Sequence, residues 1–515
     1  MAAADEPLLQ GSAHHQYASS LDTEEPPHIN EENLLPTPPH LQTFTSLDMA
    51  TLWWGIVTSV STFYVAGSLV EEGMSWWQGL LTVVAANVLQ ALLAISIGHA
   101  GAKYGIAFPI QCRASLGTRG AHFATCLRGI VACGWFGIDT WIGGQALFAF
   151  IDSLCSGKLQ SYSTISWLGI TLPELGCFFL FWLLQLAFIW NGVHGIRFLE
   201  KYASPVLLLL CGGLLVWAYI KAGGFGEMLS ATSQFGKDGA KQGQFWTVWI
   251  AGLTANIGSY ATVSLNISDF TRYARSQKDQ ILGQVGLPLF VGAFSFVGLA
   301  VSSATEKIFG YVISNPTDLI GQIGGAFPTL IALLGVTLAI LTTNVANIVA
   351  PANALINVSP SYMNFRKGAL LTAVVGFLIQ PWRLYQTGNA FMNTWLLGYS
   401  FLLGPLASII LVDYYILRHC ILDVPALLGV ANLHTYKYFW GFNAKAFAAF
   451  LVGAVSNLPG FLYTVGVLKQ VPSVWVLLYK ASWFSSFLLT GLVFWLISAV
   501  PKMVEHAEVN KDRSI

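Results

Sequence analysis

The sequence predicts an all-α, polytopic membrane protein with twelve transmembrane helices. Of its 515 residues, 55% are hydrophobic and only 10% are charged, whereas a soluble domain carries roughly 25% charged residues. Apolar runs of about 20 residues, the length that crosses a bilayer, recur along most of the chain. Lys and Arg together number 25, as do Asp and Glu, so no basic excess indicates nucleic-acid binding.

The first 46 residues are expected to form a disordered, acidic tail. They are rich in Pro, His, Ser and acids, and they contain neither Lys nor Arg. Such a composition cannot bury enough apolar surface to support a folded core. The membrane region therefore begins near residue 47.

Twelve apolar stretches make up the membrane region. We expect them near residues 49–70, 76–98, 126–151, 172–194, 203–220, 245–268, 282–304, 326–349, 367–387, 390–412, 444–466 and 473–499. Ten form a transport core over 47–412, two more follow with their preceding loop in 413–500, and 501–515 form a second tail. The loops that this topology places in the cytoplasm hold most of the Lys and Arg, which predicts that both termini are cytoplasmic.

The first and sixth of these spans are predicted to be broken helices. Small and polar residues interrupt both of them, namely Gly55, Thr58, Ser59, Ser61, Thr62 and Gly67 in the first, and Gly252, Asn256, Gly258 and Ser259 in the sixth. The two spans hold matching positions in two five-helix halves, which is typical of an inverted-repeat transporter with a midplane site. Close packing of small residues is the alternative, and it explains one such span more readily than a matched pair.

The third span carries one carboxylate among aromatic residues and glycines. Asp139 lies in CLRGIVACGWFGIDTWIGGQ, residues 126–145, four residues after Trp135, so both side chains share one helix face. A flat indole beside a hydrogen-bond acceptor suits a flat ligand with ring N–H groups. A structural pair with a neighbouring helix is the alternative, but an acid at bilayer depth is costly and favours a functional role.

The eighth span, LAILTTNVANIVAPANAL, contributes a third polar cluster. Thr342 and Thr343 bring hydroxyls, and Asn344 and Asn347 bring amides. Hydroxyl and carbonyl oxygens are the hard ligands that an alkali cation needs. Alternatively, each Thr hydroxyl bonds back to the preceding helical turn; the run of two Thr and two Asn modestly favours a binding role.

Five motifs resemble nucleobase:cation symporter family 1, the purine, pyrimidine, allantoin and hydantoin permeases, and in particular its plant and algal members. They are FPIQCRASLGTRG, WFGIDTWIGGQAL, SLNISDFTRYAR, TTNVANIVAPANALINVSP and GPLASIILVDYYILR, starting at residues 108, 135, 264, 342 and 404. The resemblance covers about residues 45 to 500. It implies a LeuT-type core, a five-plus-five inverted repeat, followed by two additional helices.

The resemblance also implies a substrate site. Trp135 matches the tryptophan that stacks on one face of the substrate ring, and Tyr260 matches the aromatic residue, usually Trp, on the other face. Asp139 stands where relatives carry Gln or Glu; an ionised carboxylate only accepts hydrogen bonds, so it favours ligands with N–H groups, and it could equally carry a proton. Asn347 matches the asparagine whose amide pairs with the lactam edge of the substrate. Ser59 stands at the first-span position where the hydantoin transporter has Gln, and its polar contact with the substrate would be shorter.

A sodium site would map to the first and eighth spans. Its ligands would be the carbonyls of Gly55, Thr58 and Ala339 and the hydroxyls of Thr342 and Thr343. The family pattern TN-x-A-A-N is one residue longer than the matching segment here, and a deletion rotates a helix by about 100°. A gapless alignment instead keeps Asn347 in place and replaces one sodium-binding hydroxyl by Leu341, so the register across residues 342–347 stays open.

Together these features predict a secondary symporter that imports a planar nitrogenous heterocycle, of the nucleobase, allantoin or hydantoin type, with a cation. We favour a proton over sodium, because an intramembrane acid is suited to carry one. A vitamin B6 or thiamine-type compound is the alternative cargo. A membrane enzyme would need a nucleophile with a base, or a metal cluster, and the sequence offers neither. We expect no cofactor besides the coupling cation, no partner besides substrate, cation and lipid, and location in the plasma membrane rather than an internal membrane.

Overall fold

The computed structural model describes residues 34–190, 193–323, 325–359, 362–385, 387–429, 436 and 438–512. Regular structure in this part of the chain is helical apart from two isolated bridges, Phe44 with Ala274 and Thr164 with Thr171. The first half contains η1 (Pro39–Leu41), α2 (Ser46–Val57), α3 (Val60–Glu71), α4 (Trp76–Tyr104), α5 (Phe108–Leu116), α6 (Thr118–Leu154), η2 (Lys158–Ser161), α7 (Leu172–Trp190) and α8 (Val193–Ala222).

The second half and the C-terminal region follow. The second half contains α9 (Phe225–Met228), α10 (Phe245–Leu265), α11 (Ser268–Thr271), α12 (Gln277–Val285), α13 (Leu287–Phe309), α14 (Pro316–Ile323), α15 (Ala326–Val358), α16 (Phe365–Leu378), α17 (Pro381–Leu384), η3 (Ala390–Leu396), α18 (Leu397–Leu411) and η4 (Val412–Leu417). The last region contains α19 (Val424–Leu428), η5 (Phe439–Gly441), α20 (Ala444–Val455), α21 (Leu458–Thr464), α22 (Ser473–Lys480) and α23 (Ser482–Asp512).

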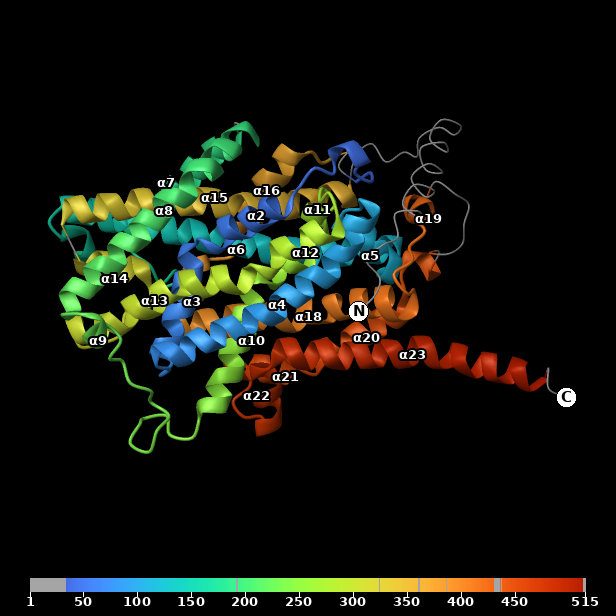
Figure 1. Ribbon diagram of the computed structural model, residues 1–515. Coiled ribbons are helices and arrows are strands. Elements are labelled where there is room, and N and C mark those ends of the chain that lie inside the picture. Colours follow the sequence, from blue (N-terminus) through green and yellow to red (C-terminus); the bar gives the residue numbers. More distant parts are fainter. Residues whose placement is uncertain are drawn as a thin grey trace.

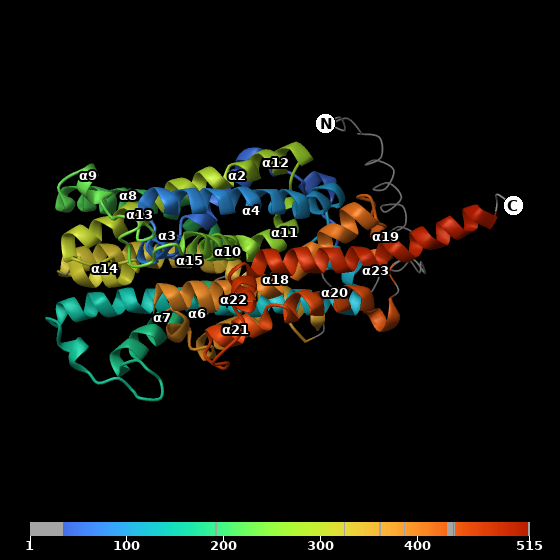
Figure 2. The same ribbon diagram turned by 90° about the horizontal axis from the view of Figure 1, so that it is seen from below.

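The long helices run side by side in one bundle (Figure 1). Helices α9 and α14 lie at one end of it and α11 and α19 at the other, as Figure 2 also shows. Helix α6 packs along α15, so the third and eighth predicted spans are neighbours in the interior. This pairing brings the acid of one span next to the amides of the other.

The helical fold agrees with the sequence prediction. Each of the twelve predicted stretches contains helix. Among the described residues, six helices are long and apolar enough to cross a membrane, and a seventh span results if the bent pair α2 and α3 counts as one. Twelve crossings therefore stay a prediction.

Residues 34–46 are ordered, whereas the sequence predicted disorder up to residue 46. Thr37 is buried; its N–H donates to the carbonyl of Gly105 over 2.9 Å, and its hydroxyl accepts from Nε of Arg272 over 2.7 Å. Gly105 has φ +67°, a conformation that favours glycine, and this turn lets the two backbones approach. The expected disorder thus does not extend through residues 34–46, and residues 1–33 lie outside the described part. At the other end, α23 continues as helix to Asp512, inside the segment expected to be a tail.

The first span is broken and the sixth is not. Helices α2 and α3 meet at 61° across Thr58 and Ser59, and Ser59 is the N-cap of α3, accepting from the N–H of Thr62 over 3.1 Å. Helix α10, in contrast, is continuous through the cluster of Gly, Asn and Ser where a break was predicted. The side chains there bond to their own helix: Nδ2 of Asn256 donates to the carbonyl of Gly252. Since these polar groups are satisfied locally, α10 has no need to open.

Candidate functional site

Asp139 lies on α6, where glycines allow neighbouring elements to come close. A Cβ atom on Gly134 would lie 2.2 Å from the Trp395 ring, and one on Gly137 would lie 2.3 Å from the carbonyl oxygen of Gly376. Only glycine fits at such distances. The two glycines therefore let η3 and α16 pack directly on the part of α6 that carries the acid.

The Asp139 carboxylate joins three of the predicted spans. It is only 5% exposed; Oδ1 accepts from Oγ of Ser61 on α3 over 3.1 Å, and Oδ2 accepts from Nδ2 of Asn347 on α15 over 3.2 Å. An ionised carboxylate has acceptor positions for about four hydrogen bonds, so capacity is left for a ligand. The structure thus brings Asp139 and Asn347 together, as expected. Ser61, which we did not predict as a site residue, is the first-span partner of the acid.

A second cross-helix contact lies beside the first. The hydroxyl of Thr62 is 2.7 Å from the phenolic oxygen of Tyr260 on α10 and 2.8 Å from Oγ of Ser59. Ser59, expected as a direct substrate contact, therefore caps α3 and connects to Tyr260 through Thr62. The sequence feature that could have indicated a role for Ser61 and Thr62 in the site is their position directly after the predicted break.

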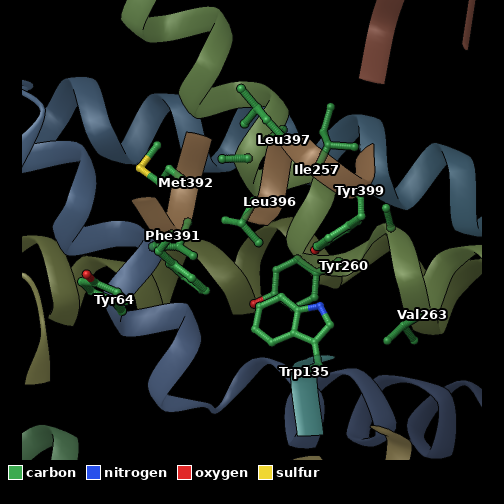
Figure 3. Packing of buried hydrophobic residues seen from close by; sticks show 14 of the residues in the cluster. Tyr64, Trp135, Ile257, Tyr260, Val263, Phe391, Met392, Leu396, Leu397 and Tyr399 are labelled. Atoms are coloured by element: carbon green, nitrogen blue, oxygen red, sulfur yellow. The ribbon is translucent and has the colours of Figure 1, made fainter. Parts of the chain in front are cut away.

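Two aromatic rings border the same region. Trp135 is 6% and Tyr260 5% exposed. Figure 3 shows the Trp135 ring reaching from α6 toward that of Tyr260, with Phe391 beside them. The ring of Trp135 meets those of Phe391 and Trp395 edge-on, at 5.9 and 6.1 Å, and within the described residues its indole N–H has no hydrogen-bond partner. An aromatic wall of this kind is suited to a flat ligand.

Behind Asn347 runs a buried row of three polar side chains, of which the sequence analysis singled out only Asn344. Nδ2 of Asn347 donates to Oδ1 of Asn344 over 3.1 Å, and Nδ2 of Asn344 donates to Oε1 of Gln185 on α7 over 2.6 Å. Nε2 of Gln185 then donates to Oγ1 of Thr140 on α6 over 2.8 Å. A lone Gln in the apolar stretch LFWLLQLAFIW was the available signal for this helix.

The five predicted sodium ligands are only partly described. Ala339 packs against Val60, directly after the break in the first span, and a Cβ on Gly55 would meet nothing within 4 Å. The hydroxyl of Thr343 donates to the carbonyl of Ala339 over 2.9 Å, and that of Thr58 donates to the carbonyl of Trp54 over 2.8 Å. Both threonines thus make the back-bonds of the simpler interpretation. The side chain of Thr342 lies outside the described residues.

Comparison with known proteins identifies relatives over nearly the whole chain. The family model described as permease for cytosine/purines, uracil, thiamine and allantoin matches residues 36–485. The chain is 48% identical to the purine-uracil permease NCS1 of Arabidopsis thaliana over 472 residues, which are 92% of this chain and 78% of that protein. It is 34% identical to the allantoin permease of Bacillus subtilis, over 94% of this chain and 97% of the relative.

A solved structure has the same fold. Mhp1, described as a nucleobase-cation-symport-1 family transporter in a closed conformation with bromovinylhydantoin bound, superposes with a TM-score of 0.69 at 22% identity. The match covers 93% of this chain and 96% of Mhp1.

Proposed function

Because the chain belongs to the family of permeases for cytosine/purines, uracil, thiamine and allantoin, we propose that it is a symporter importing a planar nitrogenous heterocycle together with a cation. Its relatives are permeases rather than enzymes, in agreement with the sequence analysis. The proposed cargo is a purine or pyrimidine nucleobase or allantoin.

The observation that carries this proposal is the convergence of three spans on Asp139. Ser61 and Asn347 donate to the two oxygens of one buried carboxylate. Trp135 precedes Asp139 by one helical turn, and its ring lies beside that of Tyr260 (Figure 3). We infer that the two rings cover the faces of the heterocycle while Asp139 and Asn347 hold its edge. The break between α2 and α3 is a natural place for movement between inward and outward states.

We propose the proton as the coupling ion. Asp139 is a membrane-embedded acid in contact with two other spans, which is a typical arrangement of a proton-carrying site. The proposed sodium ligands Thr343 and Ala339 bond to each other, which gives sodium less support. The fine details of the fold, twelve crossings in a five-plus-five repeat with cytoplasmic termini, belong to the same proposal.

A thiamine-type compound is the second candidate cargo. The matching family description names thiamine, and a carboxylate at Asp139 suits a cationic or N–H-rich ring. This alternative keeps the fold and the site and changes only the ligand.

Uptake into cells that lack their own permeases tests the proposal. Labelled adenine, guanine, uracil, allantoin and thiamine are supplied at several pH values, with and without sodium. We expect uptake of at least one nucleobase or allantoin, faster at low external pH and independent of sodium. Uptake of thiamine alone would favour the second cargo, and uptake of none of the five would refute both. A requirement for sodium would overturn the proposed proton coupling.

A further inference from the structure

The hydrogen bonds behind Asn347 have a direction that one backbone carbonyl fixes. Oγ1 of Thr140 lies 2.6 Å from the carbonyl oxygen of Phe136. A carbonyl cannot donate, so the hydroxyl hydrogen of Thr140 must point to it. The oxygen of Thr140 is then an acceptor for its other neighbour, Gln185, 2.8 Å away.

This direction passes along the row of amides. Gln185 gives its nitrogen to Thr140 and therefore presents its oxygen to Asn344, whose nitrogen donates over 2.6 Å. Asn344 in turn presents its oxygen to Asn347, whose nitrogen donates over 3.1 Å. Turning any one amide around would place two oxygens or two NH₂ groups against each other, and buried unpaired groups of that kind are costly.

The result is a defined orientation of Asn347. Its two N–H hydrogens go to Asn344 and to Oδ2 of Asp139. Its carbonyl oxygen has no hydrogen-bond partner within the described residues. Thr140, Gln185 and Asn344 are 0%, 1% and 2% exposed, so water does not compete for these bonds.

We propose that Gln185 and Thr140 are positioning residues that set substrate specificity, because they force Asn347 to offer only an acceptor. This inference rests on the proposed function and deepens it. Asp139 in its ionised form also only accepts, so before it takes up a proton the edge of the site has no donor from either residue. It selects planar heterocycles with two neighbouring N–H donors on one edge, such as the amino-lactam edge of a 2-amino-6-oxopurine, and it discriminates against rings where one donor is missing.

Competition by two purines tests this selection in the wild-type protein. Guanine and hypoxanthine differ only in the 2-amino group, which supplies the second donor. Against uptake of whichever labelled heterocycle the protein accumulates, we expect guanine to inhibit at concentrations about tenfold lower, because a hydrogen bond to a charged acceptor contributes on that scale. Equal inhibition, stronger inhibition by hypoxanthine, or inhibition by neither would overturn the inference while leaving the symporter proposal intact.

Two variants test the role of the row itself. Thr140→Val removes the group that fixes the direction, and Gln185→Leu removes the link. We expect either to reduce the preference for guanine about fivefold, the effect of roughly one neutral hydrogen bond, since the carboxylate of Asp139 alone then orients Asn347. Thr125→Val is the matched control: it lies on the same helix and is equally buried, and its hydroxyl bonds only to carbonyls of its own helix.

The ratio of the inhibition constants of guanine and hypoxanthine does not depend on how much protein reaches the membrane. Poor folding of a variant therefore lowers uptake but leaves this ratio unchanged. An unchanged ratio in both variants, or the same change in Thr125→Val, would overturn the positioning role. If a variant gives no measurable uptake, thermal-shift measurements of guanine and hypoxanthine binding to the purified protein give the corresponding ratio of affinities. Failure of the wild type to take up or bind any heterocycle would refute the proposed function itself.

Discussion

The first and sixth spans contain the same kinds of polar residue but use them in opposite ways. On α3, Ser61 donates to Asp139 of another helix, and Thr62 reaches Tyr260. On α10, the hydroxyl of Ser259 bonds to the carbonyl of Ala255 in its own helix. The two hydroxyls after the break thus reach other helices, whereas Asn256 and Ser259 of the continuous span bond to their own helix.

Composition alone therefore does not separate a binding site from a helix that only packs. In α10 the small residues serve packing: Gly258 lets the tenth-span segment approach closely enough for Tyr399 to donate to the Gly258 carbonyl over 2.8 Å. This is the close-packing interpretation, and it applies to the sixth span. The first span has caps at Thr58 and Ser59, and directly after this break Ser61 and Thr62 reach other helices.

Asp139→Asn is expected to have the largest effect, because Asp139 is the acceptor toward which the first span directs Ser61. An amide offers one oxygen where the carboxylate offers two, and it carries no charge. We expect uptake to fall about 100-fold, since hydrogen bonds to charged groups contribute on that scale, or the variant to prefer a different substrate. Asp152→Asn is the control: Asp152 is also a buried acid on α6, but its carboxylate accepts from Leu159 and Gln160 of η2. Unchanged uptake and pH dependence in Asp139→Asn would remove Asp139 from the site.

Gly258→Ala is expected to have the next largest effect, and on stability rather than on chemistry. The added Cβ would lie 2.6 Å from Oγ of Ser400 and 3.1 Å from the carbonyl oxygen of Leu396. Overpacking of this kind costs about 1–3 kcal/mol. Gly55→Ala in the first span, where a Cβ meets nothing within 4 Å, should leave the thermal midpoint of the purified protein unchanged. Equal loss of thermal stability in both variants would contradict the distinction between a packed glycine at 258 and an open one at 55.

Part of the fold and of the candidate site could be predicted from the sequence. The helical fold, the buried acid and its partner Asn347 followed from hydropathy, from the cost of an intramembrane charge and from the family motifs. Ser61 and Gln185 did not, because their roles depend on which helices lie next to each other. The predicted break in the sixth span failed for a related reason: a side chain that bonds four residues back cannot be distinguished, in sequence, from one that reaches across.

Ser61→Ala measures the cross-helix bond of the first span. Removing the hydroxyl takes one donor from Oδ1 of Asp139 and leaves the helix otherwise unchanged. We expect uptake to fall about tenfold, on the scale of a hydrogen bond to a charged group, with protein levels in the membrane unaffected. Uptake at wild-type level would mean that this buried contact contributes nothing to transport.

Ser259→Ala makes the same chemical change in the sixth span and should have the smallest effect. The hydroxyl that is lost lies 3.0 Å from the carbonyl of Ala255, and this carbonyl belongs to the continuous helix α10, whose interior carbonyls accept from the backbone N–H four residues on. Because a back-bond of this kind adds little to a helix, we expect uptake within about twofold of wild type and a stability change within about 0.5 kcal/mol. If uptake instead falls as far as in Ser61→Ala, the sixth span must turn its polar groups toward the site in another state of the transport cycle. The contrast between the two spans would then be a property of one conformation.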